Sequence, residues 1–485
     1  MLLPEQKAYT DVLLSVTPSL ASKELSAVPS RLHRLRRELA QLLRLSSPIV
    51  AAQISQSAMG FVDTLMAGRV GAGELAAVAM GSSLWFPLFL FMLGVLMAVP
   101  PSVAHLQGAG RQRDIGDHVR QALLIALALA ALIFLALRNM APVLARMAVP
   151  EADALRTLAY LEGVSWGMPA IALFFVLRHF SEGLSVSRPS MLIGFAGLFV
   201  NVCANYVLIY GKLGFPALGG VGCGWATALA FWVMALGMLV TVRRGRIYQN
   251  SRLFEAWPRL RPSEALRILK LGVPIGCSIF VEASVFALIA LLLGSLGAET
   301  VASHQISLSF ASMVFMVPMS IASGISVRVG HALGRGEPTG ARRSALSGMG
   351  LTAAFSLVSA SLSFVFADEV AALYTNQPQV AALAASILRL GALFQFSDAI
   401  QVSAAGALRG YKDTRVPMLL VIVAYWGLGL PLGYSLGLTD LWGEPRGAAG
   451  FWMGLIAGLS CAALLLGLRL RRVMAKHQRT VDERG

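Results

Sequence analysis

Three carboxylates lie inside long apolar stretches of this sequence, where a charged group is costly. Glu282 follows Gly272 by ten residues, a depth of about 15 Å at the rise of a helix. Asp398 lies midway between two arginines, and Asp63 lies six residues before the next arginine. A carboxyl group in apolar surroundings can exchange a proton near neutral pH, and its oxygens also suit a hard cation. The three acids are therefore candidate proton or cation sites.

Two amides accompany one of these acids. Asn201 and Asn205 lie four residues apart in one apolar stretch and so share a helix face. They can hydrogen-bond a carboxylate such as Asp63. The alternative is a structural role, as polar contacts between helices.

The surrounding elements are membrane-spanning helices. The chain is 56% hydrophobic and only 13% charged, whereas soluble domains carry about 25% charged residues. Several charge-free runs exceed the roughly 20 residues that a helix needs to cross a bilayer. The sequence predicts an all-α membrane protein with twelve spans, at 47–67, 82–104, 119–138, 156–178, 189–211, 219–241, 270–294, 301–327, 345–367, 384–407, 416–438 and 447–468.

The basic residues give the orientation. Of the 40 Lys and Arg residues, 33 fall on the side of the twelve-span scheme that holds both termini, and seven fall on the other. Basic residues concentrate in cytoplasmic segments, so both termini are expected in the cytoplasm. This distribution also accounts for the net charge of +15 without a nucleic-acid partner.

The two halves of the chain resemble each other. Residues 103–110 and 329–336 share the pattern V-x-H-x-x-G-x-G, at an offset of 226. Residues 182–191 and 409–418 also align, at an offset of 227. Each repeat holds six spans, so the repeats insert in the same orientation, an arrangement typical of carriers with a site near the midplane.

These observations define the expected organisation. Five segments are predicted: a tail with a basic amphipathic helix, an N-lobe, a basic inter-lobe loop, a C-lobe and a C-terminal tail, at 1–46, 47–241, 242–269, 270–468 and 469–485. His304 and Gln305 open the eighth span and are expected at the outer interface.

Three segments resemble a known family. FVDTLMAG at 61–68, ASHQI at 302–306 and ALRGYKDTRVP at 407–417 are similar to the multidrug and toxic compound extrusion (MATE) family, and to its bacterial NorM-type branch in particular. The resemblance covers roughly residues 35–470. It implies two six-helix lobes in a V shape around a central cleft, and efflux of cationic amphipathic compounds driven by inward H⁺ or Na⁺ flow.

The resemblance also assigns roles. It implies coupling acids at Glu282, Asp398 and Asp63, and paired asparagines in the fifth span. In sodium-coupled relatives a tyrosine lies one turn before the acid of the tenth span. That position here is Phe394, which has no oxygen ligand, so H⁺ is favoured and Na⁺ at Glu282 and Asp398 is the alternative. No other metal, no cofactor and a monomer in the lipid bilayer are expected.

Two other functions remain open. A lipid-linked precursor flippase of related fold would need a cavity rich in arginine, whereas this sequence places acids at mid-depth. A membrane enzyme would need a metal-ligand cluster or a nucleophile and base near the interface. The sequence contains no H-E-x-x-H, G-x-S-x-G or Walker A pattern.

The topology is testable by labelling single cysteines in intact cells and in inverted vesicles. A cysteine at Lys212 is expected to react from outside, and one at Arg246 from the cytoplasm, because they flank opposite ends of the sixth span. Reaction of both from the same side would disprove the twelve-span scheme.

Overall fold

The computed structural model describes residues 31–147, 149–255 and 259–482. Its contacts divide the chain into two units, Met1–Gln41 and Leu42–Gly485. The tail predicted over residues 1–30 lies outside the described residues. The predicted amphipathic helix is the beginning of a longer one, α3 (Arg31–Val70), which continues into the first span without a break.

The described residues are helical apart from loops and one isolated bridge between Leu441 and Gly443. In the first half, α3 is followed by α4 (Ala72–Leu96), α5 (Val99–Gly108), α6 (Gln112–Arg138), α7 (Ala141–Arg146), α8 (Glu151–Gly183), α9 (Arg188–Tyr210), α10 (Val221–Arg244) and α11 (Arg246–Gln249). The second half contains α12 (Pro262–Leu293), a 3₁₀ turn (Gly294–Leu296), α13 (Ala298–Gly334), α14 (Pro338–Val365), α15 (Ala367–Tyr374), α16 (Pro378–Gly410), α17 (Arg415–Ile422), a π-helix (Val423–Gly429), α18 (Leu430–Leu438) and α19 (Ala448–Asp482).

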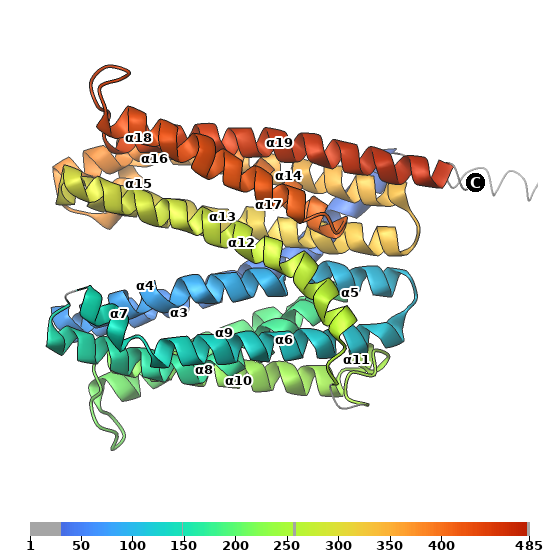
Figure 1. The fold of residues 1–485 in the computed structure, drawn as a ribbon, viewed down its shortest axis with the longest axis horizontal. Helices are drawn as coiled ribbons and strands as arrows, with labels where there is room; N and C mark the ends of the chain where they lie inside the picture. Colours follow the sequence, from blue (N-terminus) through green and yellow to red (C-terminus); the bar gives the residue numbers. More distant parts are fainter. Residues whose placement is uncertain (1–30, 148, 256–258, 483–485) are drawn as a thin grey trace, which may run out of the picture. The chain divides into compact units, whose positions relative to one another are not determined.

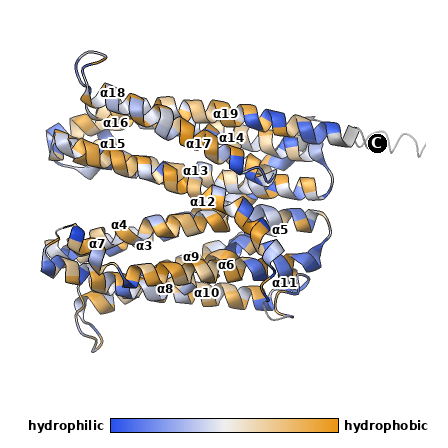
Figure 2. Ribbon diagram, viewed as in Figure 1, coloured by the Kyte–Doolittle hydropathy of each residue, from blue (hydrophilic) through white to orange (hydrophobic). Residues whose placement is uncertain are grey.

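Eleven helical segments of the described residues are long and apolar enough to span a membrane. The remaining predicted span lies in α3, which carries polar residues at 53 and 55–57. Three predicted elements differ in detail. The second span bends between α4 and α5, the eleventh contains the π-helix, and the inter-lobe loop is shorter because α12 already begins at Pro262. Polar residues gather at the two ends of the helices, and apolar residues dominate between them (Figure 2).

Within the second unit the helices form two bundles (Figure 1). In one, α8 packs against α4, α6 and α10, and α9 packs against α10. In the other, α16 packs against α13, α14 and α19. Each bundle has its own apolar core. The predicted class, an all-α membrane protein with two six-helix lobes, is confirmed.

The first helix of each repeat begins against the opposite lobe. Leu42 of α3 lies in the core of the C-lobe, whereas Met59 further along lies in the core of the N-lobe. The helix α12 does the reverse, because Ile268 packs in the N-lobe and Val285 in the C-lobe. These crossings tie the two lobes together at the predicted cytoplasmic end.

The repeated motif V-x-H-x-x-G explains a close contact between α5 and α13. A Cβ atom on Gly108 would lie 2.3 Å from the carbonyl oxygen of His331, and one on Gly334 would lie 2.2 Å from that of His105. The two glycines and two histidines therefore make a symmetrical pair of contacts between the lobes. Only a residue without a side chain allows the backbones to approach this closely.

The second repeated motif has an equivalent explanation inside each lobe. A Cβ atom on Gly183 would lie 2.7 Å from Cβ of Val103, and one on Gly410 would lie 2.7 Å from Cβ of Val329. The glycine of the second motif thus packs on the valine of the first. The glycines of both sequence motifs therefore mark places where helices touch.

The lobe contact can be tested with Gly334→Ala. We expect this change to lower the free energy of unfolding by about 1–3 kcal/mol, because the backbone of α5 must shift to admit the methyl group. Thermal unfolding in detergent measures it. Gly350→Ala is the matched control, since nothing lies within 4 Å of its Cβ position. Equal stability of the two variants would contradict the close contact.

Candidate functional site

The structure brings the predicted polar residues of the N-lobe together. Asp63 of α3 is 7% exposed, and Asn201 and Asn205 of α9 are fully buried. Asn205 donates its Nδ2 to Oδ1 of Asp63 at 2.6 Å, and Asn201 donates to the same oxygen at 3.1 Å. Asn205 also donates to Oδ1 of Asn201 at 3.1 Å. The four-residue spacing places both amides on one face of α9, opposite Asp63.

A third donor to Asp63 is absent from the sequence-based set. Thr227 of α10 donates its Oγ1 to Oδ2 of Asp63 at 2.9 Å. Both carboxylate oxygens of Asp63 are therefore hydrogen-bonded. A threonine in an apolar helix gives no sequence signal of this role, because only the packing of α10 shows that it faces α3.

The C-lobe carries a different arrangement. Glu282 of α12 accepts a hydrogen bond from Oη of Tyr425 at 2.9 Å. Tyr425 is 1% exposed and lies in the π-helix at Val423–Gly429. Such local widening of a helix occurs frequently at functional sites. Sequence reasoning missed Tyr425, although the nearby Gly427, Gly429 and Pro431 are local signs of irregular structure.

Asp398 of α16 completes this group. It is 6% exposed and close enough to Glu282 and Tyr425 to interact electrostatically with both. Its Oδ1 has no hydrogen-bond partner among the residues that the structure describes. A buried, unpartnered carboxyl oxygen is costly unless it binds a proton, a cation or water. The structure thus places Glu282 and Asp398 together and Asp63 in the other lobe.

Two other predicted residues lie in the C-lobe core. Phe394 is 5% exposed, and its ring packs against Trp452 at 5.4 Å and Phe286 at 6.1 Å between centroids. His304, expected at the outer interface, lies near the start of α13 with its side chain packed inside the lobe. This residue is fully buried, and its Nδ1 accepts a hydrogen bond from Nε1 of Trp452 at 3.2 Å. Position along a helix did not reveal which face of α13 is covered by α19.

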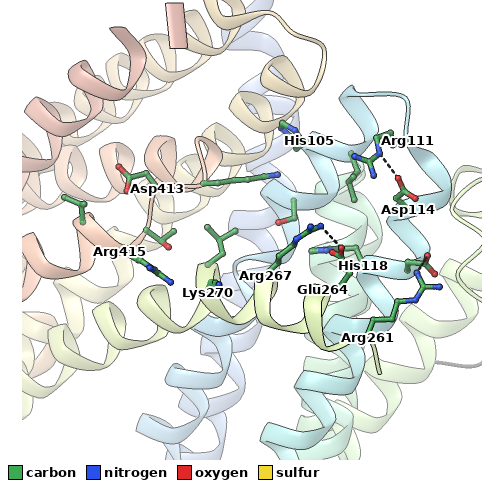
Figure 3. A pocket seen from close by; sticks show the side chains of 17 residues that line it. His105, Arg111, Asp114, His118, Arg261, Glu264, Arg267, Lys270, Asp413 and Arg415 are labelled. Carbon is green, nitrogen blue, oxygen red and sulfur yellow. Dashed lines mark hydrogen bonds and ion pairs between the residues drawn. The ribbon is translucent and has the colours of Figure 1, made fainter. Parts of the chain in front are cut away.

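A cavity of the described residues lies away from these acids. It measures about 800 Å³ and lies where α5, α6, α12 and the turn after α16 meet (Figure 3). Its walls are strongly charged, with residues such as Arg111, Glu264, Lys270 and Arg415. Among the residues described, no group of three or more His, Cys, Asp or Glu side chains is placed to hold a metal ion.

Two homologous six-helix bundles, each with a buried acid inside a span, define a membrane carrier built from parallel repeats. The sequence comparisons agree with this class. The MatE family model matches residues 48–207 and again 274–435, so the second match begins 226 residues after the first (274 − 48). This offset is the one that relates His105 to His331. The chain belongs to the MatE family, whose members are transporters and not enzymes.

Individual relatives cover nearly the whole chain. The multidrug resistance protein PmpM of Pseudomonas aeruginosa is 48% identical over 459 residues, which cover 94% of this chain and 96% of the relative. The multidrug resistance protein NorM of Vibrio cholerae is 44% identical over 440 residues, 90% of this chain and 96% of the relative. The resemblance to the NorM-type branch is therefore confirmed.

Solved structures support the fold. The eukaryotic MATE transporter AtDTX14 superposes with a TM-score of 0.82 at 19% identity, over 92% of this chain and 99% of that chain. A MATE structure in the bent conformation gives 0.83 at 18% identity, over 91% and 97% of the two chains. At this identity the likeness concerns the fold alone.

The hydrogen bonds to Asp63 predict a stability effect. Asn205→Ala removes the shortest of them from a buried carboxylate, so we expect the free energy of unfolding to fall by about 1–3 kcal/mol. Thermal unfolding in detergent measures the change. Val202→Ala, on the exposed side of the same helix, serves as control and is expected within about 0.5 kcal/mol of the parent. Similar losses for both variants would contradict the network.

Proposed function

We propose that the protein exports cationic amphipathic organic compounds across the bacterial inner membrane in exchange for H⁺, as a monomer with both termini in the cytoplasm. Relatives named multidrug resistance proteins, which align over nine-tenths of this chain, support the substrate class. The acids inside the spans support the preference for cations, because they offer negative charge in an apolar medium.

One observation carries the proposal. Oδ1 of Asp398 is buried without a hydrogen-bond partner in the described part of the chain, next to Glu282 and Tyr425. In the charged form this group attracts a cation. In the protonated form it loses that attraction. Binding of a proton and binding of a cationic compound are therefore mutually exclusive at this site, which is the requirement for exchange.

The fold suggests how the exchange is linked to movement. The lobes meet at the glycine contacts between α5 and α13 and along α4 and α12. We propose that the lobes rock about these contacts and so open the acids to either side in turn. A proton that enters from outside would neutralise Glu282 or Asp398 and release the exported compound there. Asp63, held by three donors, serves the other lobe.

The choice of ion rests on Phe394. This ring lies one turn before Asp398 and packs on Trp452, so it supplies no oxygen ligand to a metal ion. A sodium ion prefers several oxygen ligands. The hydroxyl of Tyr425 donates a hydrogen bond to Glu282 and so places one oxygen atom near the acids. For this reason Na⁺ is the alternative to H⁺.

The flippase alternative has one observation in its favour, the basic cavity of about 800 Å³. Its cations, however, lie at helix ends rather than at mid-depth. Arg111 immediately precedes α6, Arg261 immediately precedes α12 and Lys412 follows α16. A flippase would need this charge along the path through the membrane.

Transport by reconstituted protein tests the proposal. Proteoliposomes are loaded with ethidium, and a H⁺ gradient or a Na⁺ gradient is imposed separately. We expect ethidium movement with the H⁺ gradient alone. Glu282→Gln or Asp398→Asn should reduce this movement to the level of ethidium-loaded liposomes without protein. Glu299→Gln, an exposed acid of the same lobe, should transport like the parent.

Movement that needs Na⁺ at fixed pH would replace H⁺ with Na⁺ as the coupling ion. Translocation of a fluorescent anionic lipid precursor without any ethidium movement would favour the flippase. Normal gradient-driven transport by both amide variants would refute the role of Glu282 and Asp398. Membrane insertion and thermal unfolding of each variant show whether loss of transport reflects loss of the fold.

A further inference from the structure

The basic cavity at the predicted cytoplasmic end has no role in the proposed exchange. Its walls carry six basic and four acidic side chains together with two histidines. They come from the ends of α5 and α6 in the N-lobe, from the start of α12, and from the turn at 411–414 in the C-lobe. Figure 3 shows these side chains around one common space.

The acids of the cavity are already paired. Asp114 accepts from Arg111 at 2.6 Å, and Glu264 accepts from Arg267 at 2.6 Å, as Figure 3 shows. Asp117 pairs with Arg261 at 2.7 Å and with Arg120, and Asp413 pairs with Arg469 at 2.7 Å. Each negative charge of the wall is therefore compensated by an arginine.

Three cations remain. Lys270, Lys412 and Arg415 line the cavity and have no hydrogen bond or ion pair within the described residues. Partial desolvation, together with repulsion from Arg111 and Arg267, lowers the pKa of Lys412. All three residues are exposed to solvent, and their like charges around one space attract an anion that enters it.

A histidine provides a second, independent sign of a ligand. His118 of α6 lines the cavity and is 9% exposed, and its Nε2 has no hydrogen-bond partner in the part of the chain described. A buried polar nitrogen without a partner costs free energy. In the tautomer that carries the proton on Nε2, His118 could donate a hydrogen bond to an acceptor oxygen of a ligand.

The internal repeat shows that the charge is not a by-product of the turn. Lys412 has a left-handed backbone with φ of 61°, and Ser185, at the equivalent place in the first repeat, has φ of 62°. Equivalent backbone hydrogen bonds close both turns. The N–H of Asp413 donates to the carbonyl oxygen of Leu408, and the N–H of Val186 donates to that of Ser181. The fold requires the conformation in both lobes, but only the C-lobe turn carries a cation.

From these observations we propose that the cavity binds a phosphate group, either the headgroup of an anionic phospholipid or free phosphate. Lys270, Lys412 and Arg415 supply the positive charge, and His118 supplies a hydrogen bond. Basic pockets between spanning helices at the cytoplasmic face are suited to anionic headgroups. Because the ligand would contact both lobes and α12, its binding stabilises the arrangement in which these ends lie together.

The test uses the purified full-length protein in detergent. One arm titrates sodium phosphate against sodium chloride of equal ionic strength, and follows heat of binding and thermal unfolding. The other adds phosphatidylglycerol or zwitterionic phosphatidylcholine and counts bound lipid by native mass spectrometry. The variant Lys412→Gln/Arg415→Gln removes two cavity cations. Arg243→Gln/Arg244→Gln removes two exposed cations of α10, on the same membrane side and outside the cavity.

We expect the cavity variant to weaken binding at least about tenfold, whereas the control stays within about twofold, because each basic residue contributes about 1 kcal/mol toward an anionic headgroup. A loss seen with free phosphate identifies phosphate as sufficient. A loss confined to phosphatidylglycerol identifies the headgroup. Absence of binding by the parent, or equal weakening in both variants, would overturn the proposal. If the double variant fails to fold, Lys270→Gln gives the same comparison.

Discussion

The contact of α5 with α13 is the constraint on which the arrangement of the two lobes depends. Gly108 and Gly334 each lie against the carbonyl of a histidine from the other repeat. Because neither position carries a side chain, the backbones of the two helix ends come into contact. The crossings of α3 and α12 bury further apolar side chains against the opposite lobe. The lobes are thereby joined where α5 and α13 end, whereas the hydrogen-bond partners of Asp63 and Glu282 named above come from each acid's own lobe.

The two lobes use the shared frame for different chemistry. Both oxygens of Asp63 are hydrogen-bonded by side chains of α9 and α10, which fixes the position of the carboxyl group. Asp398 keeps an oxygen without a partner among the described residues and lies beside Glu282. The C-lobe therefore holds an acid with an unsatisfied oxygen among the described residues, whereas both oxygens of the N-lobe acid are hydrogen-bonded.

The sequence predicted the features that depend only on residue type and spacing along the chain. A charge in an apolar run is visible in the sequence, so Asp63, Glu282 and Asp398 were found, although their coupling role is still a prediction. The four-residue spacing of Asn201 and Asn205 correctly predicted that they share one face of a helix. Thr227 and Tyr425 were missed because neither type is unusual in an apolar helix, and their partners depend on how helices rotate and pack. The contact of His304 with Trp452 was missed for the same reason.

The repeat separates what the fold needs from what function adds. Positions that match between the halves, such as the glycines and the left-handed turns at Ser185 and Lys412, occur where helices end or touch. Some charged or polar groups that differ between the halves lie instead in a cavity or beside a buried acid. The cation of Lys412 is one such difference, and the π-helix that positions Tyr425 against Glu282 is another. Helix packing explains the positions that match between the halves. The charged and polar groups that differ call for another explanation, such as a ligand, a proton or a partner.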